Sequence, residues 1–100
     1  MLVYEVTVDV RDDLRPAYEE FMVERHIPDV MATGAFSGAL FERSASGVYR
    51  IRYDARDRAS LDDYFSGAAT ALRCDLLEHF PEGLEISREE WTRINLFLDT

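Results

Sequence analysis

The sequence contains no lysine, and all eleven of its basic residues are arginine. Chemistry that needs a lysine side chain, such as Schiff-base formation or general-base catalysis by an ε-amine, is therefore excluded. Positive charge is also in the minority, because 20 acidic residues give the chain a net charge of −9. Nucleic acids and anionic membrane surfaces attract clustered positive charge, so we expect neither as a partner.

Cysteine and long apolar runs are equally scarce. The single cysteine, Cys74, has no partner for an internal disulfide, which is typical of a reducing compartment. No apolar run approaches the roughly 20 residues that span a membrane. The first residues lack the basic stretch and apolar core of a signal peptide, so we expect a cytoplasmic protein.

Motifs that bind metals or phosphates, or that carry nucleophiles, are missing as well. The two histidines, His26 and His79, lie far apart, and neither His-x-x-x-His nor Cys-x-x-Cys spacing occurs. There is no glycine-rich phosphate loop and no Gly-x-Ser-x-Gly elbow. We therefore expect no metal site and no cofactor.

What the sequence does contain is enough apolar material for one globular domain. A length of 100 residues with 47% hydrophobic and 12% aromatic residues predicts a single domain, 1–100. Period-two alternation predicts a strand over 2–10. Apolar residues at helical spacing from Leu14 predict a helix, with Asp12 or Asp13 accepting from its first N–H groups. Pro28 should kink or end it.

The same sequence signals predict the helices and strands of the rest of the chain. A short helix from Pro28 to Ala32 should end at Gly34 in the left-handed conformation. Strands over 36–43 and 48–55 are joined by a turn of about four residues. A second helix, with Ser60 and Asp63 resembling a capping box, should run to Phe80 before a last strand over 84–94.

This order of elements predicts an α+β fold. Right-handed crossovers give a ferredoxin-like βαββαβ domain, with a four-stranded antiparallel sheet in the order 4-1-3-2 and two helices on one face. Glu5 should pair with arginines across the open face. That face should carry Val3, Glu5, Thr7, Ala39, Phe41, Val48, Arg50 and Arg52.

Apolar residues near the C-terminal end favour a partner chain. Trp91 and a tail containing Leu96, Phe97 and Leu98 are more hydrophobic than the edge of a monomer requires. We predict a homodimer that packs through the sheet face and the C-terminal tail.

The stretch 26–36 reads His-Ile-Pro-Asp-Val-Met-Ala-Thr-Gly-Ala-Phe. Together with 4–8, 64–65 and 71–73, it resembles a small uncharacterised family, one of the domains of unknown function, within the dimeric α+β barrel superfamily. The resemblance implies a ferredoxin-like subunit that dimerises through its sheet. The wider superfamily includes cofactor-free monooxygenases, haem-degrading enzymes and small-ligand-binding proteins. It implies no role for any particular residue, since fold does not supply function.

His26 is the main candidate for chemistry near neutral pH. If it projects between the helices and the sheet, it can act as a general base, a metal ligand or a haem ligand. The alternative is a histidine that interacts with the end of a helix just before a proline. His79, in the last turn of the second helix, suits the helix dipole.

An aromatic set should gather on the inner face of the sheet. Apolar walls with a few hydroxyl groups and one histidine are typical of a small-molecule pocket, but also of an ordinary core with tyrosines at its margin. The set comprises Tyr4, Phe36, Tyr49, Tyr53 and Tyr64.

Two hypotheses follow for function. The first is a homodimeric domain that binds a small apolar or aromatic ligand or serves as an interaction module. The second is a cofactor-independent monooxygenase-like or isomerase-like enzyme with His26 as the base. Catalysis would need a cavity of roughly 300 Å³ or more with His26 on its wall. Haem binding through His26 is a third, weaker hypothesis.

Overall fold

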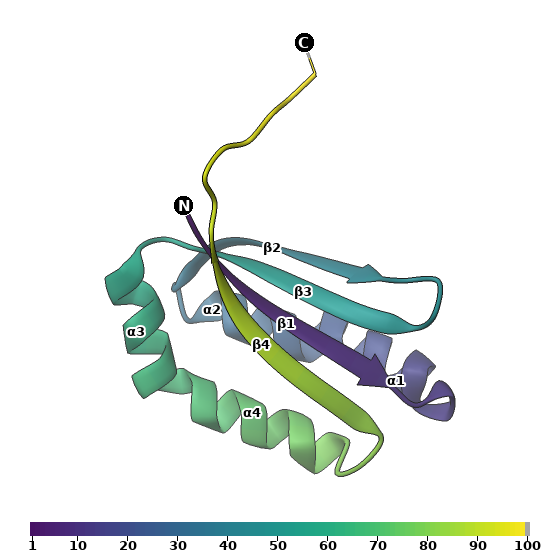
Figure 1. The fold of residues 1–100 in the computed structure, drawn as a ribbon. Coiled ribbons are helices and arrows are strands. Elements are labelled where there is room, and N and C mark those ends of the chain that lie inside the picture. The colour runs from purple at the N-terminus through teal and green to yellow at the C-terminus, as the bar shows by residue number, and fades with distance from the viewer. Residues whose placement is uncertain (100) are drawn as a thin grey trace.

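The computed structural model describes residues 1–99 as a sheet covered on one face by helices (Figure 1). Residue 100, the last of the expected domain, lies outside the described residues. The strands are β1 (Leu2–Val10), β2 (Phe36–Arg43), β3 (Val48–Ala55) and β4 (Leu84–Thr92). The α-helices are α1 (Arg15–Phe21), α2 (Ile27–Ala32), α3 (Arg58–Ser66) and α4 (Ala68–His79).

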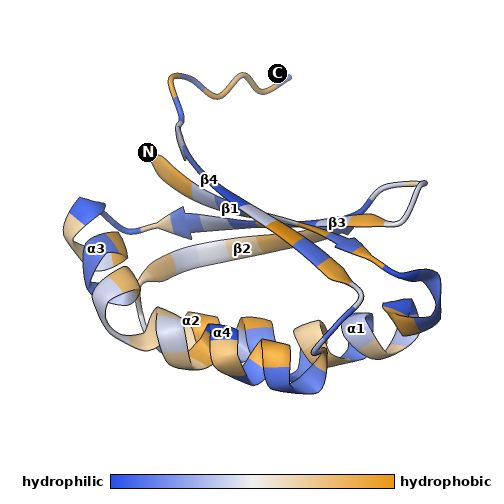
Figure 2. Cartoon of the chain, turned by 60° about the horizontal axis from the view of Figure 1, so that its bottom comes forward, coloured by the Kyte–Doolittle hydropathy of each residue, from blue (hydrophilic) through white to orange (hydrophobic). Residues whose placement is uncertain are grey.

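The sheet confirms the predicted topology. All three strand pairs are antiparallel and the order is β2-β3-β1-β4, so β1 and β3 are the central neighbours. The helices lie together beneath one face (Figure 2), and their buried apolar residues, such as Met22, Leu61 and Leu76, belong to the same core as those of the sheet. Tyr4, Val8 and Val10 of β1 are buried there, as the alternation predicted.

The first helical segment does not stop at Pro28. A 3₁₀ turn (Asp12–Leu14) leads into α1, and a π-helical turn (Met22–His26) joins α1 to α2. Ile27 N–H donates to the Met22 carbonyl, a bond one residue longer than that of an α-helix. The proline ring would clash with the carbonyl four residues earlier in a regular helix, and the wider turn relieves that clash. Gly34 then ends α2 with φ +79°, as predicted.

Two expected helix caps are wrong. No side chain caps the 3₁₀ turn, because Asp13 binds Arg11 and Asp12 binds Arg15 instead. The second helix begins earlier than expected, and its cap is Asp57, which accepts from the Ser60 N–H at 2.7 Å. That helix is also divided into α3 and α4 at Gly67, where a Cβ would meet the Asp63 carbonyl at 3.0 Å.

A β-bulge near the start of β2 changes which side chains face the helices. Phe36 is paired with Ala55 and Gly38 with Asp54, so Ser37 is the extra residue. Phe41 therefore packs inward against Tyr18, which corrects the expectation that Ala39 and Phe41 lie on the open face. Leu40 takes that outer place instead and is 61% exposed.

The open face of the sheet combines charge pairs with apolar groups. Arg50 and Arg52 lie 3.6 and 3.7 Å from the Glu5 carboxylate, which confirms the predicted cross-strand pairing. Trp91 donates to the same carboxylate at 2.8 Å and lies opposite Val3, which is fully buried. Beyond β4 an extended tail rises away from the sheet (Figures 1 and 2).

The tail exposes a row of apolar side chains, namely Ile94, Leu96, Phe97 and Leu98. Within residues 1–99, no helix is both long and apolar enough to cross a membrane.

Candidate functional site

His26 lies at the end of the π-helical turn with its side chain turned towards the sheet. It is 9% exposed, and its Nδ1 has no hydrogen-bond partner among the described residues. Burial lowers the pKa of His26, because the charged imidazolium loses more hydration than Asp75 and Asp29 restore by attraction. The imidazole is therefore neutral at pH 7 and its ring nitrogens are available for a hydrogen bond or a proton.

A small inner chamber opens beside His26. It has a volume of about 30 Å³, and its wall includes Tyr18, whose hydroxyl is also buried with no partner in the described part of the chain. The other lining residues are Tyr4, Val6, Val8, Met22, Ile51, Tyr53, Tyr64, Arg73 and Arg88. Such a volume suits one water molecule or one functional group of a ligand. It is far below the roughly 300 Å³ expected for a substrate cavity.

An outer pocket of about 280 Å³ lies on the solvent side of this chamber. Three residues, Tyr4, Arg73 and Arg88, line both spaces and so lie between them; we call these three residues the neck. Phe65, Glu89 and Glu90 complete the outer wall. The ring of Phe65 meets Tyr4 edge-on at 5.0 Å, and the Arg73 guanidinium lies 5.9 Å from the Phe65 centroid. This outer pocket is large enough for a small aromatic molecule.

Four members of the predicted aromatic set do converge. The ring centroids of Tyr4 and Tyr53 are 5.9 Å apart, those of Phe36 and Tyr53 5.0 Å, and those of Phe36 and Tyr64 5.1 Å. Burial raises the pKa of Tyr64 to about 12, so its phenol stays neutral. Phe36 packs behind the others and touches neither cavity.

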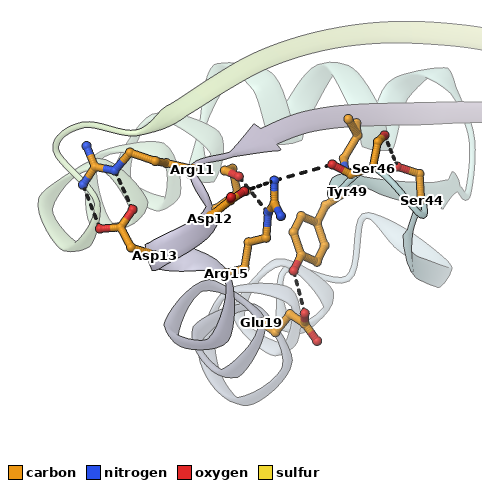
Figure 3. Close-up of polar contacts among 10 residues, drawn as sticks. Arg11, Asp12, Asp13, Arg15, Glu19, Ser44, Ser46 and Tyr49 are labelled. Atoms are coloured by element: carbon orange, nitrogen blue, oxygen red, sulfur yellow. Dashed lines mark hydrogen bonds and ion pairs between the residues drawn. The ribbon is translucent and has the colours of Figure 1, made fainter.

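Tyr49 belongs to a different group. Its ring packs 5.0 Å from Tyr18 and 5.5 Å from Phe41, at the opposite end of the sheet from Phe36. Its hydroxyl donates to Glu19 Oε2 at 2.5 Å, on the outer side of α1 (Figure 3). Arg15 in the same region reaches the Val10 and Ser46 carbonyls, so this cluster fixes α1 against the sheet. Tyr49 therefore does not line the chamber.

A polar cluster ties the two helical segments together close to His26. Arg25 donates to Asp75 at 2.7 Å and lies 3.3 Å from the His79 ring. His79 stacks on Phe21 at 4.4 Å, and Phe21 in turn lies 6.2 Å from His26. His79 thus acts in helix packing, outside the chamber.

The most polar residues of this site have no signal in the sequence pattern. Arg73 and Arg88 come from α4 and β4, and neither stands out in a chain with eleven arginines. Tyr18 stands at helical spacing among the apolar residues of the predicted first helix, where a tyrosine is typical of an ordinary core. No group of three or more His, Cys, Asp or Glu side chains able to hold a metal occurs within residues 1–99.

Haem does not fit the space beside His26 as the helices are packed. A porphyrin is much larger than the 30 Å³ chamber that His26 lines. We therefore derive no role for His26 as an axial ligand.

The ferredoxin-like fold of this chain is shared by several solved structures. A monooxygenase from the gene ActVA-Orf6 of Streptomyces coelicolor, solved with nanaomycin D, is similar with a TM-score of 0.78 and 14% identity over 99% of this chain and 92% of that one. A variant of MhuD, with two manganese protoporphyrin IX molecules bound per active site, has a TM-score of 0.75 and 13% identity, over 99% of this chain and 100% of that one. HapK from Hahella chejuensis has a TM-score of 0.73 and 13% identity, over 100% of this chain and 99% of that one. At these identities the similarity establishes the fold alone.

Residues 1–94 match the family described as domain of unknown function DUF4286, and the chain belongs to that family. No match is found among curated proteins.

Proposed function

We propose that this chain is a homodimeric domain that binds a small aromatic or apolar molecule between its helices and its sheet. One observation carries the proposal: His26 Nδ1 and the Tyr18 hydroxyl, two buried polar groups without a partner within residues 1–99, line a chamber that shares three wall residues with an aromatic outer pocket. Buried polar atoms without partners cost stability and are rare in native proteins. A ligand group that enters the chamber would satisfy them.

The ligand would place its ring in the outer pocket, since the chamber has no room for one. There the ring meets the edge or face of Phe65 and the rim of Tyr4, contacts worth about 0.5–1.5 kcal/mol each beyond area burial. A hydroxyl or carbonyl group of the ligand would reach past the neck towards His26.

Dimerisation is supported by the exposed apolar side chains on the open face and the tail. Leu40, Trp91 and Phe97 are 61%, 45% and 85% exposed, which is unusual for groups this large on a lone subunit. The exposed thiol of Cys74 suits a reducing compartment, so the cytoplasm is the proposed location.

The binding test uses 2-naphthol, which is neutral at pH 7. We expect it to shift the backbone amide signals of Tyr4 and Phe65 and the ring signals of His26, while amides on the open face, such as Val48, stay unchanged. Phe65→Ala should weaken binding at least threefold. Leu77→Ala, which removes an exposed apolar side chain of α4 outside both cavities, should not. Shifts confined to the tail or the open face would contradict the proposed site.

A second candidate is proton abstraction by His26, favoured by its neutral, buried imidazole. A proton on a carbon next to a ligand carbonyl would move to the ring nitrogen, and the electron pair would move to the carbonyl oxygen as an enolate. The Tyr18 hydroxyl can donate to that oxygen. Enolate formation is a first step shared by isomerisation and by cofactor-independent oxygenation.

This candidate is tested with 2-tetralone in D₂O by following the exchange of its acidic α-protons. Wild-type protein should accelerate exchange, and His26→Gln should abolish the acceleration while 2-tetralone still binds. If 2-tetralone binds to wild-type protein without faster exchange, the chain is a binding domain and not a catalyst of this step.

A further inference from the structure

Arg73 and Arg88 stand apart from the other arginines of this acidic protein. Eight of the eleven arginines lie within 4.0 Å of an Asp or Glu carboxylate, namely Arg11, Arg15, Arg25, Arg43, Arg50, Arg52, Arg58 and Arg93. Arg56 donates to the Gly34 carbonyl at 2.9 Å. Among the described residues, Arg73 and Arg88 have no carboxylate at ion-pair distance, although acidic groups outnumber basic ones.

These two guanidinium groups meet at one place. Arg73 extends from α4 and Arg88 from β4, and both belong to the neck. Arg73 is held by its hydrogen bond to the Tyr4 hydroxyl at 3.2 Å and by its position over the Phe65 ring. A guanidinium that is already oriented loses less entropy when it binds an anion.

The acidic neighbours decide which anion fits. Glu90 is engaged by Arg58 at 2.9 Å, whereas Glu89 lines the outer pocket with no arginine at ion-pair distance. Glu89 would repel a dianion such as phosphate more strongly than it repels a monoanion. A carboxylate carries a single charge and matches the planar fork of an arginine.

We propose that Arg73 and Arg88 bind the carboxylate of an aromatic acid at the neck, with the ring of the acid against Phe65. The inference rests on the proposed function and narrows it to a ligand class, namely aromatic monocarboxylates. A second polar group of the ligand, next to the carboxylate, would enter the chamber and meet His26.

The test compares 2-naphthoate with the uncharged 2-naphthamide, two probes of the same shape that differ in charge. We expect 2-naphthoate to bind at least tenfold more tightly to wild-type protein. Arg73→Gln and Arg88→Gln should each weaken the binding of 2-naphthoate at least fivefold and change the affinity for 2-naphthamide by less than twofold. Arg11→Gln, which removes an exposed arginine far from the neck, should leave both unchanged. Raising the salt concentration should weaken only the carboxylate.

The test distinguishes a wrong carboxylate preference from a wrong ligand-binding function. If both probes bind at the neck with equal affinity and the arginine variants change nothing, the proposed function stands and the carboxylate preference is wrong. If neither probe shifts the His26 and Phe65 signals, the ligand-binding function fails and this inference with it. Retained amide dispersion in the Gln variants would show that a loss of affinity is not unfolding.

Discussion

The hydroxyl of Tyr18 should lower the stability of the free protein. Its ring is fully buried and packs 5.0 Å from Tyr49 and 5.9 Å from Phe80, but its oxygen has no hydrogen-bond partner among residues 1–99. A buried polar group without a hydrogen bond costs about 1–3 kcal/mol, because the unfolded chain hydrates it. Tyr18→Phe keeps the ring and removes that cost, at the price of a small void. We expect it to raise the free energy of unfolding by about 1 kcal/mol.

Tyr49→Phe is the matched control. It removes the same atom from a ring in the same cluster, but the Tyr49 hydroxyl donates to Glu19 (Figure 3). The free energy of unfolding of this variant should therefore fall by about 1 kcal/mol. Urea unfolding of both variants at one fixed protein concentration measures the difference, since the proposed dimerisation would make stability depend on concentration. The two midpoints should move in opposite directions. If Tyr18→Phe is as destabilising as Tyr49→Phe, the Tyr18 hydroxyl has a partner in solution and our account of the chamber is wrong.

Three further outcomes are expected. Asp57→Ala removes the cap of α3 and should cost about 1 kcal/mol in urea unfolding, whereas Asp63→Ala should cost less than half of that. Leu40→Arg, on the open face, should shift the mass measured by light scattering from dimer to monomer, and an unchanged dimer would place the interface elsewhere. Because burial lowers the pKa of His26, the unfolded chain takes up a proton first as the pH falls below about 6.5. Wild-type stability should then fall by up to about 1.4 kcal/mol per pH unit relative to His26→Gln, with no difference in slope above pH 7.

Much of the fold follows from the sequence because its signals are local. Period-two alternation predicted β1, and the bounds of β2 and β3 match their turn residues. The bulge at Ser37 has no such signal, since one extra residue leaves a plausible alternation on both sides of it. For that reason Phe41 was assigned to the wrong face.

The site was less predictable because it depends on distant contacts. The burial of His26 and the gathering of Tyr4, Tyr53 and Tyr64 follow from which faces of β1, β3 and the helices are apolar. The neck instead depends on the packing of α4 beside β4, which brings together two arginines that the sequence separates. Whether an arginine is paired with a carboxylate is a property of the folded chain, and composition does not reveal it.

The π-helical turn has a consequence for how this scaffold can change. Such a turn holds one residue more than the α-helix it replaces. Deleting a single residue from 22–26 would remove the extra residue and leave α1 and α2 in place on either side, while bringing back the proline clash that the wider turn relieves. The side chain that reaches the chamber would be exchanged in one step, while the sheet and its register stayed as they are. A change of one residue in this helix can therefore alter the chemistry of the chamber without altering the sheet.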